Sequence, residues 1–160
     1  MIERIKVAIF DFDGTLAIHK SNVFTGEDSY YKNAYLYPNI FFREIEPCSI
    51  LPEVKELIEY LKKQGTLIYC LSGIPMSFLV NAKEKFVHDN YGQDIEFLFC
   101  KSQEKKVDVV RILQSIIGCN DEEILFVDDL QSVVDIMKQN KYVGVNVKDI
   151  SVLLKKLKSL

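Results

Sequence analysis

The chain has 160 residues, a length that favours a single domain with one core of ordinary size. Hydrophobic residues make up 48% of it and charged residues 27%, which excludes global disorder and a fibrous repeat. A net charge of -3 argues against a broad surface for polyanions but allows a local basic pocket. No apolar run reaches the roughly 18 residues of a membrane span, and the N-terminus does not resemble a signal peptide. We therefore expect a soluble, cytoplasmic protein.

Five short apolar segments are typical of β-strands, and amphipathic segments lie between them. The first helix is predicted between Pro52 and Gly65, and the second begins near Pro75 with Phe78, Leu79, Ala82 and Phe86 on its inner face. A third helix ends at Gly118, and two more are centred on Val134 and Leu154. The predicted strands are Ile5 to Phe10, Thr66 to Leu71, Ile95 to Phe99, Ile124 to Val127 and Tyr142 to Val147.

Alternating strands and helices predict an α/β fold: a three-layer α/β/α, Rossmann-like domain over residues 1–160 with a parallel five-stranded sheet. One region, Ala17 to Cys48, fits no crossover, and we expect it to form a flap or small cap insertion after the first strand. It holds seven of the 18 aromatic residues, which could pack a small core or stack on a base of the substrate. These residues are Phe24, Tyr30, Tyr31, Tyr35, Tyr37, Phe41 and Phe42.

The four cysteines are widely spaced and form no Cys-x-x-Cys pair, which argues against a zinc site and a disulfide framework. We expect them to be small apolar residues that stay reduced. They are Cys48, Cys70, Cys100 and Cys119.

Polar residues follow the predicted strands, where ligands bind in parallel sheets. Carboxylates follow the first and fourth strands, a hydroxyl and a glycine follow the second, and lysines follow the third. Such groups at one edge suit a phosphate and a divalent metal. The segments are Asp11-Phe12-Asp13-Gly14-Thr15, Ser72-Gly73, Asp128-Asp129, and Lys101 with Lys105-Lys106.

Each segment also has a structural interpretation. Asp13-Gly14 could form a hairpin turn, and Asp11-x-Asp13 could open a calcium loop, but a strand precedes them and the loop's closing glutamate is missing. Ser72 could cap a helix, as could Asp128-Asp129, and lysines are usually solvated. These alternatives remain open for the single segments, whereas their common order favours a site.

Four segments taken in order resemble the motifs of the haloacid-dehalogenase-like phosphohydrolases over nearly the whole chain. The resemblance implies that Asp11 is a nucleophile that forms an aspartyl-phosphate and that Asp13 acts as the acid and base. The segments are Ile9-Phe10-Asp11-Phe12-Asp13-Gly14-Thr15-Leu16, Cys70-Leu71-Ser72-Gly73, the basic stretch at Lys106, and Leu125-Phe126-Val127-Asp128-Asp129.

The same resemblance implies ligands for the phosphate and for Mg²⁺. Ser72, the N–H of Gly73 and Lys106 would bind the phosphoryl oxygens. The metal would be held by Asp11, the backbone carbonyl of Asp13 and Asp129. Asp128 stands where the family often has glycine, and it would contact the metal directly or through water.

Lys106 is chosen over Lys105 because it stands directly before a helix whose inner face is apolar. Lys105-Lys106-Val107-Asp108-Val109-Val110 also resembles a stretch in the phosphatase domain of phage polynucleotide kinase-phosphatases, which implies Lys106 as well.

The predicted function is a Mg²⁺-dependent phosphatase that acts on a phosphate monoester. The substrate is predicted to be a small phosphorylated compound, with a nucleotide or a nucleic-acid end as the alternative. A phosphate-binding or receiver-like signalling domain without turnover is the rival, but receivers carry the accepting aspartate after the third strand. Here that strand ends in Phe99-Cys100-Lys101 without an acid.

Overall fold

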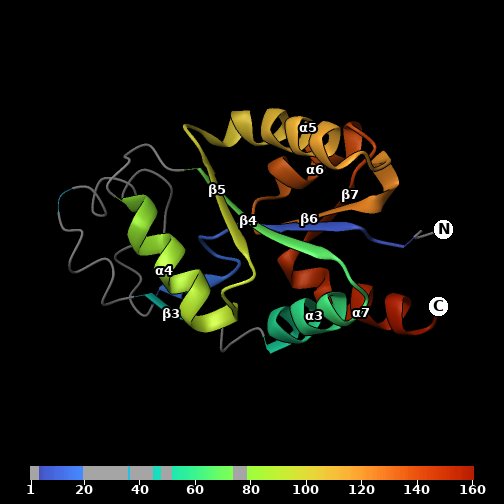
Figure 1. Ribbon diagram of the computed structural model, residues 1–160, viewed down its shortest axis with the longest axis horizontal. Coiled ribbons are helices and arrows are strands. Elements are labelled where there is room, and N and C mark those ends of the chain that lie inside the picture. Colours follow the sequence, from blue (N-terminus) through green and yellow to red (C-terminus); the bar gives the residue numbers. More distant parts are fainter. Residues whose placement is uncertain (1–3, 20–35, 37–44, 48–51, 74–78) are drawn as a thin grey trace.

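The computed structural model describes residues 4–19, 36, 45–47, 52–73 and 79–160. A five-stranded sheet forms the centre of the molecule (Figure 1), with the strand order β5-β4-β1-β6-β7. All four pairings are parallel. The strands are β1 (Val7–Phe10), β4 (Leu67–Gly73), β5 (Glu96–Cys100), β6 (Ile124–Asp128) and β7 (Val143–Asn146).

Five helices in the described chain accompany these strands, with short 3₁₀ turns at three of the connections. Two predicted ends are confirmed by glycines with positive φ: Gly65 at 80° follows the first helix, and Gly118 at 71° closes the third. The helices are α3 (Pro52–Lys63), α4 (Val80–Tyr91), α5 (Lys106–Ile117), α6 (Gln131–Gln139) and α7 (Ile150–Lys158), and the 3₁₀ turns are η3 (Gln103–Lys105), η4 (Asp121–Glu123) and η5 (Val147–Asp149).

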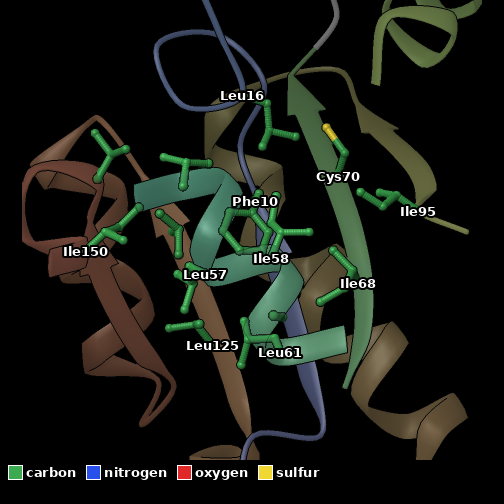
Figure 2. Packing of buried hydrophobic residues seen from close by; sticks show 14 of the residues in the cluster. Phe10, Leu16, Leu57, Ile58, Leu61, Ile68, Cys70, Ile95, Leu125 and Ile150 are labelled. Carbon is green, nitrogen blue, oxygen red and sulfur yellow. The ribbon is translucent and has the colours of Figure 1, made fainter. Parts of the chain in front are cut away.

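Helices cover both faces of the sheet because successive strand residues point to opposite sides. Ala8 and Phe10 of β1 pack with α3, α4 and α7 in one apolar cluster, seen close up in Figure 2. Val7 and Ile9 pack with α5 and α6 in a second cluster on the other face. The chain runs outward from β1 to β4 and β5 and then returns to β6 and β7. The strand order therefore reverses beside β1, the position at which open α/β sheets bind ligands.

The predicted three-layer fold with its parallel five-stranded sheet is confirmed, with small differences at the strand ends. The first strand begins at Val7, two residues after the predicted start. Ser72 and Gly73 were expected to follow a strand, but they are the last residues of β4, because Phe99 and Cys100 of β5 extend far enough to pair with them. Asp128 likewise ends β6 and lies opposite Asn146.

The predicted insertion at residues 17–48 begins and ends in an antiparallel pair, β2 (Ala17–His19) and β3 (Ile45–Pro47). Its seven aromatic residues lie outside the described residues, so the flap or cap and its contact with substrate stay predictions. Cys70 and Cys100 are buried and Cys119 is half-buried, and all three are free, whereas Cys48 lies outside the described residues. None of the helices described is long and apolar enough to cross a membrane.

Candidate active site

The turn after β1 places Asp11 and Asp13 at the reversal point of the sheet. Asp11 continues the sheet through its N–H, which donates to the carbonyl of Val127 at 2.9 Å. The buried Phe12 ring packs edge-on against Phe86, with 5.5 Å between the ring centroids. The backbone carbonyl of Phe12 accepts hydrogen bonds from the N–H groups of Leu16 and Ala17, each at 3.0 Å. Phe12 therefore anchors the turn in the core.

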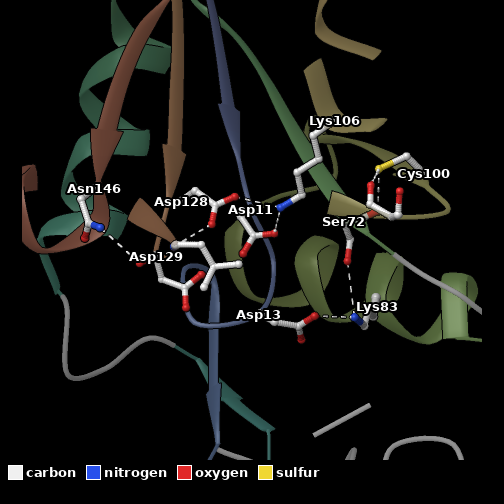
Figure 3. A network of polar contacts seen from close by, with 11 residues as sticks. Asp11, Asp13, Ser72, Lys83, Cys100, Lys106, Asp128, Asp129 and Asn146 are labelled. Carbon is white, nitrogen blue, oxygen red and sulfur yellow. Dashed lines mark hydrogen bonds and ion pairs between the residues drawn. The ribbon is translucent and has the colours of Figure 1, made fainter. Parts of the chain in front are cut away.

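Lys106 joins the first and fourth motifs at the centre of the site (Figure 3). Its ammonium lies 2.6 Å from Oδ1 of Asp11 and 2.8 Å from Oδ2 of Asp128, and all three side chains are buried. Lys105 points elsewhere: its side chain is 66% exposed and lies 3.8 Å from Asp108. The structure thus brings Lys106, rather than its neighbour, to the carboxylates.

Asp11, Asp128 and Asp129 each offer a carboxylate oxygen, and these oxygens lie within 4.8 Å of one another. A compact set of hard oxygen donors fits Mg²⁺, which prefers carboxylates and water. Asp128 also accepts from the N–H of Leu130 at 2.9 Å, but the N-cap residue of α6 is Leu130 and no side chain caps this helix, so the capping interpretation of Asp128-Asp129 is wrong. The side chain of Asp13 lies outside this carboxylate cluster.

Gly14 brings the first turn close to Asp129. Its φ is 77°, a backbone angle that residues with a side chain rarely adopt, and a Cβ atom there would stand 2.4 Å from Oδ2 of Asp129. A glycine at this position therefore satisfies both the turn and the carboxylate cluster.

Burial and the proximity of like charges shift the pKa values of the carboxyl groups in the cluster. Burial, and then repulsion from the other aspartates, raises the pKa of Asp11 well above its ordinary value, although Lys106 opposes the shift. Desolvation by surrounding protein and repulsion from Asp128 raise the pKa of Asp129 to about 7, although the residue as a whole is exposed. Burial alone would lower the pKa of Lys106, but Asp11 and Asp128 outweigh it and raise the pKa. The cluster is therefore suited to a cation.

A second lysine, Lys83 of α4, lies beside Asp13 and Ser72 in Figure 3. Its ammonium lies 2.8 Å from Oδ2 of Asp13 and donates to Oγ of Ser72 at 3.4 Å. The Ser72 side chain is buried, and its neighbour Gly73 faces Gln103 of η3. The predicted acid and the predicted phosphate ligand are thus joined by a residue that the sequence did not indicate.

Asn146, at the end of β7, supports the segment that carries Asp129. Its side-chain amide donates to the backbone carbonyl of Asp129 and to Oε1 of Gln131, both at 3.2 Å. Its own oxygen accepts from the N–H of Lys148 at 3.2 Å. This side chain therefore fixes the loop between β6 and α6.

No protein-family model matches the chain, and no curated protein matches it. Among solved structures, a protein assigned as a phosphoglycolate phosphatase from Lactobacillus delbrueckii subsp. bulgaricus is 12% identical with a TM-score of 0.62, over 90% of this chain and 86% of that one. A protein assigned as a HAD-like family hydrolase from Porphyromonas gingivalis is 16% identical with a TM-score of 0.54, over 88% and 89%. The chain has the haloacid-dehalogenase-like fold.

A phosphatase domain complexed with Mg shares this fold. It belongs to the N-terminal part of a Bacteroides fragilis protein, is 19% identical and has a TM-score of 0.55. The match covers 89% of this chain but only 35% of that one. At these identities the comparisons establish the haloacid-dehalogenase-like fold, and the chemistry depends on the residues of the site.

All the predicted site residues gather at one edge of the haloacid-dehalogenase-like sheet: Asp11, Asp13, Ser72, Gly73, Lys106, Asp128 and Asp129. Sequence analysis missed Lys83 and Asn146. Lys83 follows Leu79 by four residues and precedes Val87 by four, so it lies on the buried stripe of its helix, which was a usable signal. Asn146 is a polar residue at the end of the fifth strand, the position already examined after the other strands.

Proposed function

We propose that the chain is a Mg²⁺-dependent phosphatase that hydrolyses a phosphate monoester through an aspartyl-phosphate at Asp11. The contact of the buried Asp11 with Lys106, beside the carboxylates of Asp128 and Asp129, carries this proposal. The fold supports it, because the similar structures include proteins assigned as phosphatases and a phosphatase domain complexed with Mg.

The charges of the site explain why a cation is needed. Four carboxylates, those of Asp11, Asp13, Asp128 and Asp129, face the two ammonium groups of Lys83 and Lys106. Repulsion between a carboxylate and each phosphate charge is about 4 kcal/mol at 4 Å and an effective dielectric near 20. When bound by Asp11, Asp129 and Asp128, Mg²⁺ would supply the charge that offsets this repulsion and would polarise the phosphoryl group. The backbone carbonyl of Asp13 is a further proposed ligand.

The chain's own residues account for each proton and bond. A carboxylate oxygen of Asp11 bonds to phosphorus, the ester P–O bond breaks, and Asp13 gives its proton to the leaving oxygen. The alcohol leaves, and water then attacks phosphorus while Asp13 takes one of its protons. Breaking the acyl phosphate P–O bond releases inorganic phosphate and restores both aspartates. Asp13 thereby serves both half-reactions.

The phosphoryl oxygens would be held by groups whose positions are already fixed. Ser72 and the N–H of Gly73 end β4 beside the turn that carries Asp11. Lys106 would balance the charge that spreads over these oxygens in the transition state. Because Lys106 is buried between Asp11 and Asp128, its charge needs no rearrangement during the reaction.

The test is release of inorganic phosphate from a panel of phosphorylated metabolites, nucleotides and oligonucleotides with a 3′- or 5′-phosphate. We expect release with Mg²⁺, none after chelation, and none from Asp11→Asn at an unchanged circular dichroism spectrum. Small substrates are proposed, and turnover of the oligonucleotides alone would point to a nucleic-acid end. A wild-type protein that releases phosphate from no member of the panel would contradict the proposed function.

A further inference from the structure

Lys83 is a buried cation that the reaction as written above does not use. We propose that Lys83 is a positioning residue that fixes the carboxyl group of Asp13 for proton transfer to the leaving group. This inference rests on the proposed function, because it assigns to Lys83 a part in the same reaction. The role is tested at the step in which the ester oxygen departs.

Lys83 is buried in the core beside Asp13. The Lys83 side chain is 2% exposed and stands on the inner stripe of α4, where its neighbours one turn away, Leu79 and Val87, are apolar core residues. Lysine is almost never fully buried unless it is paired, because its charge loses hydration. Here the ammonium lies 2.8 Å from Oδ2 of Asp13 and 4.9 Å from the centre of the Phe12 ring. The helix thus carries a charge into the core at the point where it meets Asp13.

The ammonium group of a lysine donates hydrogen bonds and accepts none. Lys83 donates to Oδ2 of Asp13, so a proton carried by this carboxyl group belongs on Oδ1. The contact therefore selects the oxygen that gives up the proton and the direction in which it points. A general acid must lie within hydrogen-bonding reach of the atom that it protonates, and a fixed carboxyl group meets this condition at every turnover.

The two lysines contact different carboxylates. Lys106 pairs with Asp11 and Asp128, which belong to the carboxylate cluster, whereas Lys83 pairs with Asp13, whose side chain lies outside that cluster. Figure 3 shows the ammonium of Lys106 joined to Asp11 and Asp128 and that of Lys83 joined to Asp13 and Ser72. A residue that acts through Asp13 should therefore affect leaving-group departure and leave the binding of Mg²⁺ unchanged.

Contact with Ser72 raises a competing role, because Lys83 donates to Oγ of Ser72 at 3.4 Å and could bind the phosphoryl group itself. The two roles differ in their dependence on the leaving group. Loss of a phosphate ligand slows every ester alike. Loss of proton transfer slows esters of alkyl alcohols, which depart poorly as anions, and largely spares 4-nitrophenyl phosphate, whose phenolate departs without a proton.

The experiment compares kcat/KM for 4-nitrophenyl phosphate and for an alkyl monophosphate in wild type and Lys83→Met, because kcat/KM reports the steps up to departure of the ester oxygen and not the later hydrolysis of the aspartyl-phosphate. General acid catalysis contributes about 10²- to 10⁴-fold, so we expect kcat/KM for the alkyl ester to fall at least about 30-fold and kcat/KM for the nitrophenyl ester to fall less than about threefold. Lys85→Met is the matched control, because Lys85 lies on the same helix with a 75% exposed side chain. Its kcat/KM should stay within about twofold on both esters.

Two further measurements separate positioning from a purely structural role. In the Asp13→Asn background, Lys83→Met should cost less than about threefold on the alkyl ester, because the group that it positions is already lost. Calorimetry with Mg²⁺ alone should give the same dissociation constant for wild type and Lys83→Met within about twofold. If Lys83→Met does not fold, Lys83→Leu, which also lacks a donor and matches the apolar neighbours Leu79 and Val87, is used for the same comparisons.

Equal losses on the two esters, no loss on either, or a weakened Mg²⁺ affinity would overturn the positioning role. In those cases wild type still hydrolyses the esters, and the proposed function stands. A wild-type protein that hydrolyses neither ester would overturn the proposed function and the role of Lys83 with it.

Discussion

The ammonium of Lys106 lies 2.6 Å from Oδ1 of Asp11, and the two side chains are 0% and 4% exposed. This pair joins the start of α5 to the end of β1 across 95 residues of sequence. Each charge is tolerated in the core because the other is present, and Asp128 provides a second partner for the lysine. The pair therefore belongs both to the stability of the fold and to the chemistry proposed for it.

Lys106→Ala should destabilise the protein by about 3 kcal/mol or more, since breaking a buried pair leaves an uncompensated charge. Lys105→Ala is the matched control, because its side chain is 66% exposed and lies 3.8 Å from the Asp108 carboxylate. It should change the free energy of unfolding by less than about 0.5 kcal/mol. Urea unfolding at pH 7 measures both. A larger loss for Lys105→Ala would show that the wrong lysine has been assigned.

Gly14→Ala should lower stability and Mg²⁺ affinity together. The new Cβ atom would be strained at a φ of 77° and would collide with the Asp129 carboxylate. Gly118→Ala separates the two effects, because Gly118 has a φ of 71° but no atom of the described residues lies within 4 Å of its added Cβ. Gly118→Ala should cost about 1 kcal/mol with Mg²⁺ binding unchanged. Calorimetry with Mg²⁺ that finds full affinity in Gly14→Ala would contradict the close approach of this turn to Asp129.

The metal-free protein should lose stability as the pH rises from about 4 to about 7. The pKa of Asp129 is about 7 in the folded state and near 4 in an unfolded chain, so the folded state binds more protons in this window. Asp129→Asn removes this titrating group, so the stability of the metal-free variant should fall less between pH 4 and pH 7 than that of the wild type. Asp135→Asn, on the exposed side of α6, should leave the pH dependence unchanged.

Mg²⁺ should reverse this loss of stability at pH 7, because binding to the folded state adds to its free energy of unfolding. Thermal unfolding at several pH values, with and without Mg²⁺, measures both effects. An equal rise in Tm with Mg²⁺ for wild type and Asp129→Asn would remove Asp129 from the proposed metal ligands.

Asn146→Ala should weaken Mg²⁺ binding by about 10-fold without touching a proposed ligand side chain. Its amide holds the backbone carbonyl of Asp129, and outer partners of this kind typically contribute 10- to 100-fold to metal affinity. Asn140→Ala, at the end of α6, is a control that should keep wild-type affinity. Titration calorimetry makes the comparison, and unchanged affinity in Asn146→Ala would show that the loop is held without it.

Much of the fold could be predicted because its signals are local. The apolar runs of β1 and β6 and the glycines after α3 and α5 define elements without knowledge of their neighbours. Candidate site residues could also be predicted, because parallel strands bring their carboxyl ends to one edge of the sheet. Ser72 and Gly73 were predicted to follow their strand. They belong to β4 because they pair with β5, and the sequence of β4 alone does not show where that pairing ends.

The spacing of Lys83 indicates burial, but its contact with Asp13 could not be predicted from the sequence. A lysine on an amphipathic helix is ordinarily solvated, and the partner of a buried one depends on which strand end the helix covers. That relation joins residues 70 positions apart and exists only after the sheet has formed. Asn146 was missed because the fifth strand was predicted to run to Val147, which placed Asn146 inside it, and because a bond to the backbone carbonyl of Asp129 has no signature in the sequence.

The most direct test of the account is detection of a phosphorylated Asp11. Acid quenching of Asp13→Asn within the first turnover of 4-nitrophenyl phosphate with Mg²⁺, followed by peptide mass analysis, should find a phosphoryl group on Asp11, because this variant lacks the base that assists hydrolysis. Asp11→Asn should yield no phosphopeptide and no phosphate release. Phosphate release by Asp11→Asn at the wild-type rate, or a phosphoryl group on another residue, would contradict the assignment of Asp11 as the nucleophile.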